Sequence, residues 1–532
     1  MTASLRTDVL IVGRGPVGMT LALLLARYGV ASTVADPADR EIRLSSKAVL
    51  MHGESLEILA KVGVGDAIGR TGVRLSGSRV FVGTKELRHD RFPAPDPAGY
   101  AMAVNFPQSE TERLLLDAVD EDPLVDLRLG LTFRGLVQHE THVAAELVDE
   151  HGDTVHVDAG YVAGCDGARS TVRKQLDVRF EGHAHDDHYL IVDVRADLPF
   201  PDERRFIFHP PGGAGRTALI HPQPFSLWHL DFQVGRPPDL EAEARDGTLD
   251  RRIRAVIGDH DYEVTWSTSY VFKQLMASRF SAGRCFLVGD AAHLYAPYGA
   301  RGLNSGLADA DNLAWKLGMV VTGQAAPALL ATYDEERHAV ARHHFSVTSD
   351  TAAFMAPTTR RGRWRRDLTL ALATRVPAAR RWVDAGHFYR PEPVAMSSLT
   401  VPDPIESRAA VRSGELMPDL PAGLAREGRP LRLRAAYGLH PMVVDVPQPA
   451  GDHDDVEVTV HHLGGGLAPT RVPVSGRVAR ERVLGGCQGG AAFLVRPDGF
   501  VSRRLDHASS GADGDAVAEL ADTARILYGK EA

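Results

Sequence analysis

The sequence predicts an α/β protein of several domains, in which a parallel-sheet domain is interrupted by an antiparallel sheet and followed by a smaller α/β domain. Three observations lead to this fold class. An apolar strand, a Gly-rich turn, an apolar helix and a second strand follow one another over residues 7–36. Strand-like runs separated by Pro-Gly breaks fill residues 180–275, and the first pattern returns over 284–321. A chain of 532 residues is also too long for one ordinary core.

Local patterns support the elements in chain order. Residues 7–12 form an apolar run typical of a buried strand, and residues 17–28 are rich in good helix formers. The next strand, over 31–35, completes a βαβ unit, which implies a parallel sheet. The same signals predict a helix from Ser109, strands over 189–194, 205–208, 217–221, 227–233 and 284–288, a helix over 303–321, strands over 442–446 and 456–460, a hairpin over 492–504 and a helix over 516–528.

Shifts in composition divide the chain into three parts. We place the first domain at residues 1–178 and 276–390, because the α/β pattern stops and later resumes there. The inserted antiparallel sheet occupies residues 179–275. A proline-punctuated linker and the small C-terminal domain make up residues 391–532.

The first Gly-rich turn carries a nucleotide-binding pattern. Gly13 permits a sharp bend, Gly15 lets a pyrophosphate approach the backbone beside Pro16, and Gly18 allows close packing of helix on strand. The helix that begins there offers free N–H groups to phosphate. Asp36, at the tip of the second strand, can accept hydrogen bonds from ribose hydroxyls and disfavours a 2′-phosphate. We therefore expect a Rossmann-like domain that binds FAD or NAD.

A second Gly-rich loop favours FAD over NAD. Asp290 follows a strand and could bind a ribityl hydroxyl, which a nicotinamide dinucleotide lacks. The helix from about Leu303 aims its N-terminus at the turn before it, where the helix dipole would stabilise a reduced, negatively charged flavin. We expect the two turns to lie at opposite ends of one sheet and to bind opposite halves of one FAD. The residues expected to bind FAD in this segment are Gly289, Asp290, Pro297, Gly299, Gly302, Leu303 and Asn304.

Composition excludes several other classes. The formal net charge of −9 argues against a nucleic-acid partner. The three cysteines are widely spaced and form no CxxC pattern, so neither a disulfide framework nor a metal site is expected. No apolar stretch approaches the ~20 residues of a membrane helix, and the first strand lies too near the start for a signal peptide. We expect a cytoplasmic protein that does not enter a membrane.

Three motifs together resemble a known family. The GDAAH sequence at residues 289–293, with the glycines, asparagine and DAxNLAWKL run that follow it to residue 317, is similar to the aromatic-ring hydroxylases, the class A flavoprotein monooxygenases. Residues 166–173 match that family's DGxxSxVR motif, in which Asp166 is associated with cofactor binding. Gln108 resembles a glutamine found near the flavin, although a polar residue beside a helix start is an alternative interpretation.

The resemblance implies an activity. NADPH or NADH would reduce the FAD, and the reduced flavin would trap O2 as a C4a-hydroperoxide that hydroxylates an aromatic or phenolic substrate, polyketides included. The run 493–501 is similar to the thioredoxin-like C-terminal domain of the phenol-hydroxylase type. Without a CxxC motif, that domain is expected to have a structural role, including contacts in a homodimer.

No catalytic residue is identified firmly. Arg301 replaces a residue that is often glutamine in the family, and it could pair with an anionic substrate or reach solvent. His229, His221 and Tyr270 are candidates for a base that takes a phenolic proton, but no spacing supports them, and each of these residues is more often structural. His293 is expected to brace its loop. The arginine that the family usually has near Gly53 is missing, so the sequence does not determine the exact position of the flavin or the shape of the substrate pocket.

Other activities stay open at this point. Oxygen insertion into a polycyclic ketone, the Baeyer–Villiger reaction, uses the same cofactors. A flavin reductase or dehydrogenase would not activate O2, and substrate-stimulated oxygen uptake would distinguish it. A non-catalytic FAD-binding protein would hold flavin that neither NADPH nor NADH bleaches.

Overall fold

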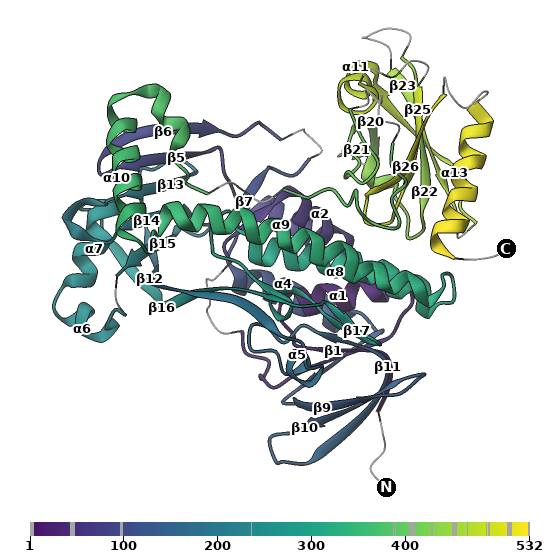
Figure 1. The fold of residues 1–532 in the computed structure, drawn as a ribbon, viewed down its shortest axis with the longest axis horizontal. Coiled ribbons are helices and arrows are strands. Elements are labelled where there is room, and N and C mark those ends of the chain that lie inside the picture. Colours follow the sequence, from purple (N-terminus) through teal and green to yellow (C-terminus); the bar gives the residue numbers. More distant parts are fainter. Residues whose placement is uncertain are drawn as a thin grey trace.

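The computed structural model confirms the α/β fold class. It describes residues 5–42, 48–95, 99–235, 237–386, 388, 390–403, 410–426, 429–449, 455–464, 466–485, 487, 490–507 and 513–529. Its two largest sheets have eight strands each. Figure 1 shows long helices between these sheets and the C-terminal domain beside one end of the helices.

The first sheet has the parallel core that the sequence predicts. Its order is β17-β18-β11-β1-β2-β8, with β10 and β9 extending from β11. The strands are β1 (Leu5–Val12), β2 (Ser32–Asp36), β8 (Val125–Leu129), β9 (Thr132–Gln138), β10 (Val143–Val148), β11 (Thr154–Gly164), β17 (Ser281–Ala282) and β18 (Cys285–Leu287). Pairs among β18, β11, β1, β2 and β8 are parallel. The carboxyl ends of several strands therefore meet at one edge.

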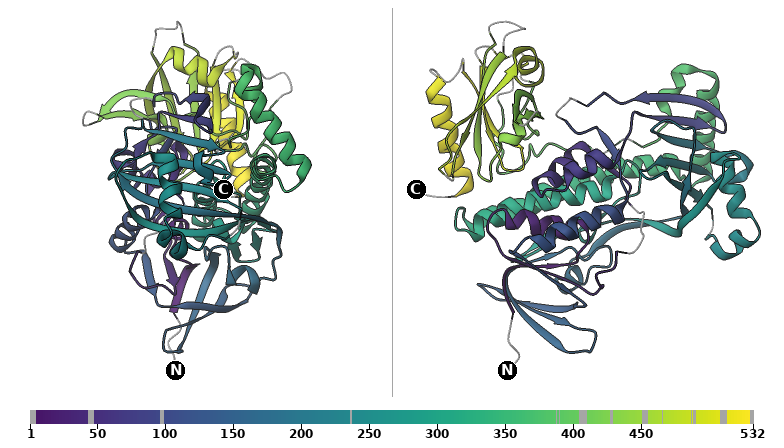
Figure 2. Two further views of the ribbon diagram at one scale, coloured as in Figure 1. Left: turned by 90° about the vertical axis from the view of Figure 1, so that its left-hand side faces the viewer. Right: turned by 180° about the vertical axis from the view of Figure 1, so that it is seen from behind.

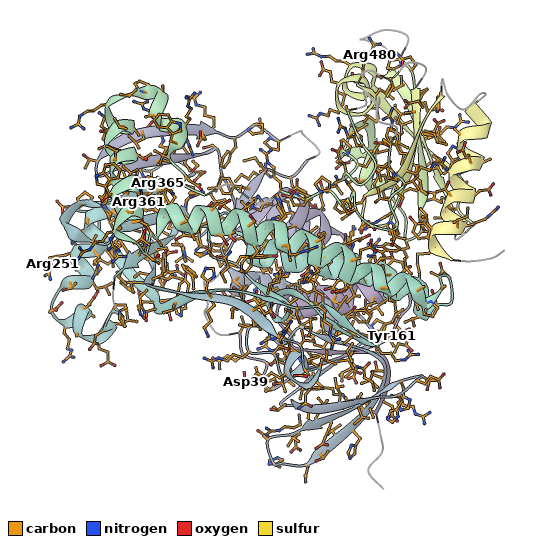
Figure 3. The ribbon with its side chains drawn as sticks, in the orientation of Figure 1. Asp39, Tyr161, Arg251, Arg361, Arg365 and Arg480 are labelled. Atoms are coloured by element: carbon orange, nitrogen blue, oxygen red, sulfur yellow. The ribbon has the colours of Figure 1, made fainter. Side chains whose placement is uncertain are left out.

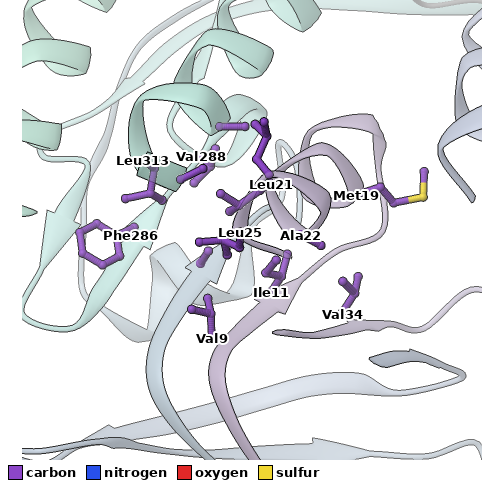
Figure 4. Close-up of a cluster of buried hydrophobic side chains, with 14 of the residues drawn as sticks. Val9, Ile11, Met19, Leu21, Ala22, Leu25, Val34, Phe286, Val288 and Leu313 are labelled. Atoms are coloured by element: carbon purple, nitrogen blue, oxygen red, sulfur yellow. The ribbon is translucent and has the colours of Figure 1, made fainter. Parts of the chain in front are cut away.

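Helices pack around this sheet and between the two sheets. They are α1 (Pro16–Ala26), α2 (Gly53–Lys61), α3 (Gly65–Thr71), α4 (Gln108–Glu121), α5 (Thr171–Gln175), α8 (Arg301–Val321) and α9 (Ala331–Met355), whereas α10 (Arg360–Arg375) lies against β6 (Lys85–Arg91) of the second sheet. Helix α1 packs on α8, and Figure 4 shows the apolar layer between α1, the strands and Leu313 of α8. The exposed arginines of α10 include Arg361 and Arg365, which are labelled in Figure 3. Within the described chain, no helix is long and apolar enough to span a membrane.

The second sheet is larger than the predicted insertion. Its order is β19-β16-β12-β15-β14-β13-β5-β6, with strands β5 (Gly77–Val82), β6 (Lys85–Arg91), β12 (Phe180–Ala196), β13 (Glu203–Phe208), β14 (Thr217–Pro222), β15 (Leu227–Val234), β16 (Tyr262–Ala277) and β19 (His293–Leu294). All but one of its strand pairs are antiparallel. The exception is β13 with β5, and β5 and β6 come from the part of the chain assigned to the first domain.

The two faces of this second sheet differ. Leu190, Leu230 and Phe232 lie on one face and pack on helix α7 (Thr248–Ile257), beside the short α6 (Leu240–Arg245). We call the other face the inner face. Phe206 and Phe208 lie on it and pack against Met355 of α9 and Leu370 of α10.

A small three-stranded sheet lies near the inner face. It consists of β3 (Leu50–His52), β7 (Ala103–Asn105) and β4 (Val73–Arg74). The remaining short elements are the 3-10 turns Pro211–Gly213, Gly289–Ala291, Pro327–Leu330, Pro377–Trp382 and Leu433–Ala436.

The C-terminal domain is an α/β unit with the predicted hairpin. Its sheet, β24-β23-β22-β25-β26, consists of β22 (Met442–Pro447), β23 (Asp455–His462), β24 (Thr470–Ser475), β25 (Gly490–Val495) and β26 (Val501–Asp506). Helix α13 (Asp513–Tyr528), the short helices Gly476–Ala479 and Arg480–Leu484, and the strands β20 (Pro421–Arg426) and β21 (Arg429–Arg432) complete it. Its strand pairs are antiparallel, because connections such as 448–454 are too short for a parallel crossover.

Four buried charges hold the C-terminal domain on the rest of the protein. We call Lys316, Glu336, Arg496 and Asp498 the buried charge cluster. Arg496 donates to both oxygens of Glu336, at 2.6 and 3.0 Å, and also binds Asp498, while Lys316 donates to Glu336 at 2.8 Å. The two views in Figure 2 show this domain against the ends of the long helices. These four charged side chains therefore lie in a buried contact between domains and are not exposed to solvent.

Candidate flavin site

The first Gly-rich turn leaves open space before a helix N-terminus. Gly13 has a φ of +110°, and a Cβ there would lie 2.4 Å from the carbonyl oxygen of Cys165. A Cβ on Gly18 would lie 2.1 Å from the carbonyl oxygen of Gly13. A Cβ on Gly15, the residue before α1, would meet no atom within 4 Å. With Pro16 as the first residue of the helix, the turn fits a pyrophosphate at Gly15.

Asp36 lies at the edge of this turn, as predicted. It is the last residue of β2, and its Oδ2 accepts a hydrogen bond from the backbone N–H of Arg14 at 2.8 Å. Its Oδ1 accepts one from the N–H of Ala38 at 2.8 Å. A carboxylate has about four acceptor positions, so the side chain is held in place with capacity left for ribose hydroxyls.

The two Gly-rich turns lie at the same edge of the first sheet. Val12 is in register with Gly164, and Gly164 with Leu287. The turns after these three strands therefore meet at the carboxyl edge, where nucleotides bind in open α/β sheets. The expectation that the turns lie at opposite ends of the sheet is wrong, because their strands are parallel. Val17 of α1 contacts the second turn, 3.3 Å from a Cβ built on Gly289.

Asp166 caps a helix at this edge. Its Oδ2 accepts hydrogen bonds from the backbone N–H groups of Thr171 at 2.6 Å and Val172 at 3.1 Å, at the start of α5. Its Oδ1 is buried and has no hydrogen-bond partner among the described residues. Arg173 of the same motif donates to the carbonyl oxygen of Ala291 at 2.9 Å. The DGxxSxVR motif thus connects to the second Gly-rich loop and leaves one carboxyl oxygen available to a ligand.

The loop before α8 presents a second helix N-terminus. Gly299 and Ala300 both have positive φ values, +83° and +54°, and α8 then begins at Arg301, two residues before the expected Leu303. A Cβ on Gly302 would meet no atom within 4 Å. The free N–H groups of this first turn would stabilise negative charge on a ring placed before them. The geometry therefore fits the flavin ring, close to Pro297 in the same loop.

Asn304 fixes the position of α8. Its Oδ1 accepts hydrogen bonds from the backbone of His52 at 2.9 Å and the hydroxyl of Ser55 at 2.6 Å. Its Nδ2 donates to the carbonyl oxygens of Leu50 at 3.0 Å and Ala300 at 2.6 Å. These four bonds use the whole capacity of an asparagine side chain. Any flavin contact of Asn304 would therefore come from its backbone.

Gln108 is half-buried at the start of α4, and two hydrogen bonds hold its amide. Its Nε2 donates to Glu112 at 2.8 Å, and its Oε1 accepts from the backbone N–H of Ala48 at 3.2 Å. Residues 43–47 lie outside the described chain.

Asp290, in the turn Gly289–Ala291, is exposed and lies at the edge where a ribityl chain would pass.

His293 braces the second loop, as predicted. Its Nε2 lies 2.6 Å from Oδ2 of Asp309, and Arg337 donates to Oδ1 at 2.7 Å. Burial alone would raise the pKa of Asp309, but the charges of His293 and Arg337 lower it below its ordinary value. Asp309 also accepts from the N–H of Gly289 at 3.1 Å. This buried triad fixes the loop rather than acting on a substrate.

Aromatic side chains connect the loop before α8 to the inner face. The hydroxyls of Tyr189 on β12 and Tyr298 in the loop lie 2.6 Å apart. The ring of Phe272 lies 4.2 Å from that of Tyr189 and 4.3 Å from that of Tyr270. Burial raises the pKa of Tyr270 well above its ordinary value. Tyr270 therefore stays protonated near neutral pH, and its predicted role as a base is not supported.

The histidines of the inner face have defined partners. His229 Nδ1 lies 2.8 Å from Oδ1 of Asp193, so the ring donates to this carboxylate. Asn105 Nδ2 lies 3.2 Å from Nδ1 of His221, which can only accept there. Burial and the nearby charges of Arg204 and His229 lower the pKa of His221 well below its ordinary value. Sequence reasoning identified both histidines but missed Asp193.

Arg301 does not reach solvent. Its side chain is 5% exposed, and its Nη1 donates to the carbonyl oxygen of Tyr298 at 2.8 Å. The solvent-exposed alternative is therefore wrong. A buried guanidinium at the N-terminus of α8 adds positive charge beside the position of the flavin ring.

Comparison with known proteins agrees with this site. A family described as "FAD binding domain" matches residues 6–348. A 3-(3-hydroxy-phenyl)propionate/3-hydroxycinnamic acid hydroxylase of Burkholderia vietnamiensis is 33% identical over 423 residues, 78% of this chain and 75% of that one. The anhydrotetracycline hydroxylase OxyS of Streptomyces rimosus has a TM-score of 0.68 at 27% identity, over 99% of this chain and 100% of that one. The flavin-dependent monooxygenase PieE shares the fold, with a TM-score of 0.76 at 24% identity over 99% of this chain and 100% of that one.

The fold and the two Gly-rich turns define an FAD-dependent oxidoreductase. The chain belongs to the FAD-binding-domain family, and within it to the FAD-dependent aromatic hydroxylases, the class A flavoprotein monooxygenases. The resemblance in its three motifs is thereby confirmed.

Proposed function

We propose that the chain hydroxylates a phenolic ring held between the loop before α8 and the inner face of the second sheet. The observation that carries this proposal is the Tyr189–Tyr298 hydrogen bond of 2.6 Å, which joins the flavin loop to that face. When bound, FAD reduced by NADH or NADPH supplies an activated oxygen atom from O2. The curated relatives that act on hydroxyphenyl compounds support a phenolic substrate.

The protein's own residues have three tasks. The backbone at Gly15 and Gly302 binds the nucleotide and the ring system, since both positions open onto free space. The rings of Tyr189 and Phe272 offer an apolar, water-excluding wall for an aromatic substrate. The His229–Asp193 pair places an oriented imidazole on the same face.

Several finer predictions from the sequence enter this proposal. Domain limits at 178, 275 and 390 remain the proposed ones, with strands β5 and β6 completing the substrate-binding sheet. The free cysteines Cys165, Cys285 and Cys487 support a reducing, cytoplasmic environment. A homodimer also remains a prediction, and light scattering during gel filtration would measure it.

Product analysis tests the proposed reaction. The purified protein should be yellow, and a panel of phenols should include members that accelerate NADH or NADPH oxidation. With isotopically labelled O2, the product should gain one labelled oxygen on the ring. Oxygen insertion into a ketone instead would point to the Baeyer–Villiger reaction. NAD(P)H consumption that yields only hydrogen peroxide with every phenol would contradict the proposal.

A further inference from the structure

Asp231 points toward the inner face from the middle of β15. Its neighbours on the strand, Leu230 and Phe232, are fully buried on the opposite face against α7. Since side chains alternate along a strand, Asp231 lies on the inner face. It is in register with Leu219 of β14, which packs in the same apolar cluster as Tyr298 of the flavin loop. Asp231 therefore faces the space where the proposed substrate would lie.

The carboxyl group of Asp231 is poorly satisfied. Its Oδ1 is buried and has no hydrogen-bond partner in the described part of the chain. Burial raises its pKa to about 6, against the opposing charge of His229. An unpaired buried carboxyl oxygen is costly, and such a group in a binding site indicates a ligand that completes its hydrogen bonding.

The other titratable groups around Asp231 are less suited to accept a proton. His229 is tied to Asp193 through Nδ1, and the pKa of Tyr270 is raised well above its ordinary value. Burial also lowers the pKa of Arg204 to about 10, where it stays charged. The titratable or charged groups facing Asp231 are His229 on its own strand, Asp193 and Tyr189 on β12, Tyr270 on β16, His221 on β14, Arg204 on β13 and Tyr298 in the loop.

We propose that Asp231 is the base that takes the phenolic proton of the substrate; this role rests on the proposed hydroxylation. The substrate O–H bond breaks, an O–H bond forms on Asp231 Oδ1, and the electron pair stays on the phenolate oxygen. No oxidation state changes in this step. The phenolate is richer in electrons, so its ring is more readily attacked by an electrophilic oxygen. The proton returns to the phenolate oxygen when the product leaves. His229 is a positioning residue, because the hydrogen bond between its Nδ1 and Asp193 fixes the orientation of its ring on the inner face.

Asp231→Asn tests the role, with Asp197→Asn as the matched control. Asp197 lies just beyond β12 on the same sheet, and its side chain is exposed. For a simple phenol, Asp231→Asn should lower kcat/KM roughly 100- to 10,000-fold, mostly in kcat. For a nitrophenol, already an anion at pH 8, the loss should be within about 10-fold. The wild-type rate should rise through about pH 6 as Asp231 ionises, and the variant should lack this rise.

Two further readouts do not depend on turnover. The ionised carboxylate of Asp231 should raise the pKa of a nitrophenol bound beside it, so near pH 7 wild type should show less of the coloured phenolate than Asp231→Asn; equal fractions would mean that Asp231 does not lie at the substrate hydroxyl. The variant should also be more heat-stable than wild type at pH 8 but not at pH 4.5. The raised pKa of Asp231 means that the folded chain binds a proton more tightly than the unfolded chain, so wild type loses stability as pH rises through about 6. An aspartate whose charged form is stabilised by an ion pair or by full hydrogen bonding would give the opposite stability result.

The outcomes separate the two proposals. If wild type hydroxylates phenols and Asp231→Asn keeps its rate and pH profile, the role of Asp231 is overturned while the hydroxylation stands. If wild type oxygenates no phenol, both proposals are overturned. If Asp231→Asn fails to fold, Asp231→Ser is assayed with the same two substrates. An equal loss of kcat/KM for the simple phenol and for the nitrophenol refutes the role of Asp231.

Discussion

Replacing Arg496 by methionine removes one of two cations from the buried charge cluster, and we expect a large loss of stability. The Arg496 and Glu336 side chains are 0% exposed and that of Asp498 is 3% exposed. In the variant, Lys316 alone would face two buried carboxylates. Removing one partner of a buried ion pair costs about 3–5 kcal/mol, and methionine keeps much of the packing volume. We therefore expect a loss of about 3–5 kcal/mol at pH 7.

The pH dependence gives this prediction a second measure. The neighbouring cations hold the pKa values of Glu336 and Asp498 below their ordinary range. A lowered carboxyl pKa contributes stability above the unfolded pKa of about 4, and this contribution is lost as pH falls through the folded value. The difference between wild type and Arg496→Met should therefore be largest at neutral pH and shrink in acid.

Urea unfolding and hydrogen exchange measure the effect. Several domains need not unfold in one step, so exchange of the β25 and β26 amides reports the local loss directly. Arg503→Met on β26 is the control, because its pair with Glu519 is partly exposed, at 26% and 47%. We expect it to cost less than about 1 kcal/mol. Equal stability of Arg496→Met and wild type at pH 7 would refute the reasoning.

Three other substitutions test the flavin site and its supports. Gly15→Leu should fold normally but lose its yellow cofactor on gel filtration, because the side chain fills the space left for pyrophosphate; undiminished flavin absorbance would contradict this. Asn304→Ala should destabilise the protein by about 2–4 kcal/mol in urea unfolding, since four buried hydrogen bonds are lost, whereas a change below about 0.5 kcal/mol would show that they matter little. Asp309→Asn should cost about 3 kcal/mol at pH 7 and progressively less below about pH 4, because the pKa of Asp309 is lowered; a cost independent of pH would argue against this.

The sequence was most informative where local backbone geometry determines the structure. The bend at Gly13, the space at Gly15 and the close contact at Gly18 follow from the absence of a Cβ. Every boundary of the βαβ unit that carries them was predicted within two residues, including that of the first strand, which starts at Leu5. The position of Asp36 followed from strand length.

Pairing between distant segments was not predictable. Strand β13 pairs with β5 across more than 100 residues, and no local signal specifies that contact. The buried charge cluster was not predictable, because charged residues are mostly exposed and no local pattern marks Glu336 or Arg496 as buried. The hydrogen bonds that occupy the Asn304 side chain were not predictable either, since its partners His52 and Ser55 lie some 250 residues away in the sequence.

The alternation of polar and apolar residues along β15 is a signal for the inner face, and the sequence analysis used it only in part. His229, Asp231 and Gln233 alternate with the apolar Leu230 and Phe232 along β15. Polar residues at every second position of a strand indicate a solvated or functional face. Here His229 and Gln233 on that face are buried, and Asp231 is half-buried. A covered polar face must be satisfied internally or by a ligand. His229 meets this demand through Asp193, whereas Asp231 Oδ1 does not within the described chain, and this difference separates a positioning group from one that can take a proton.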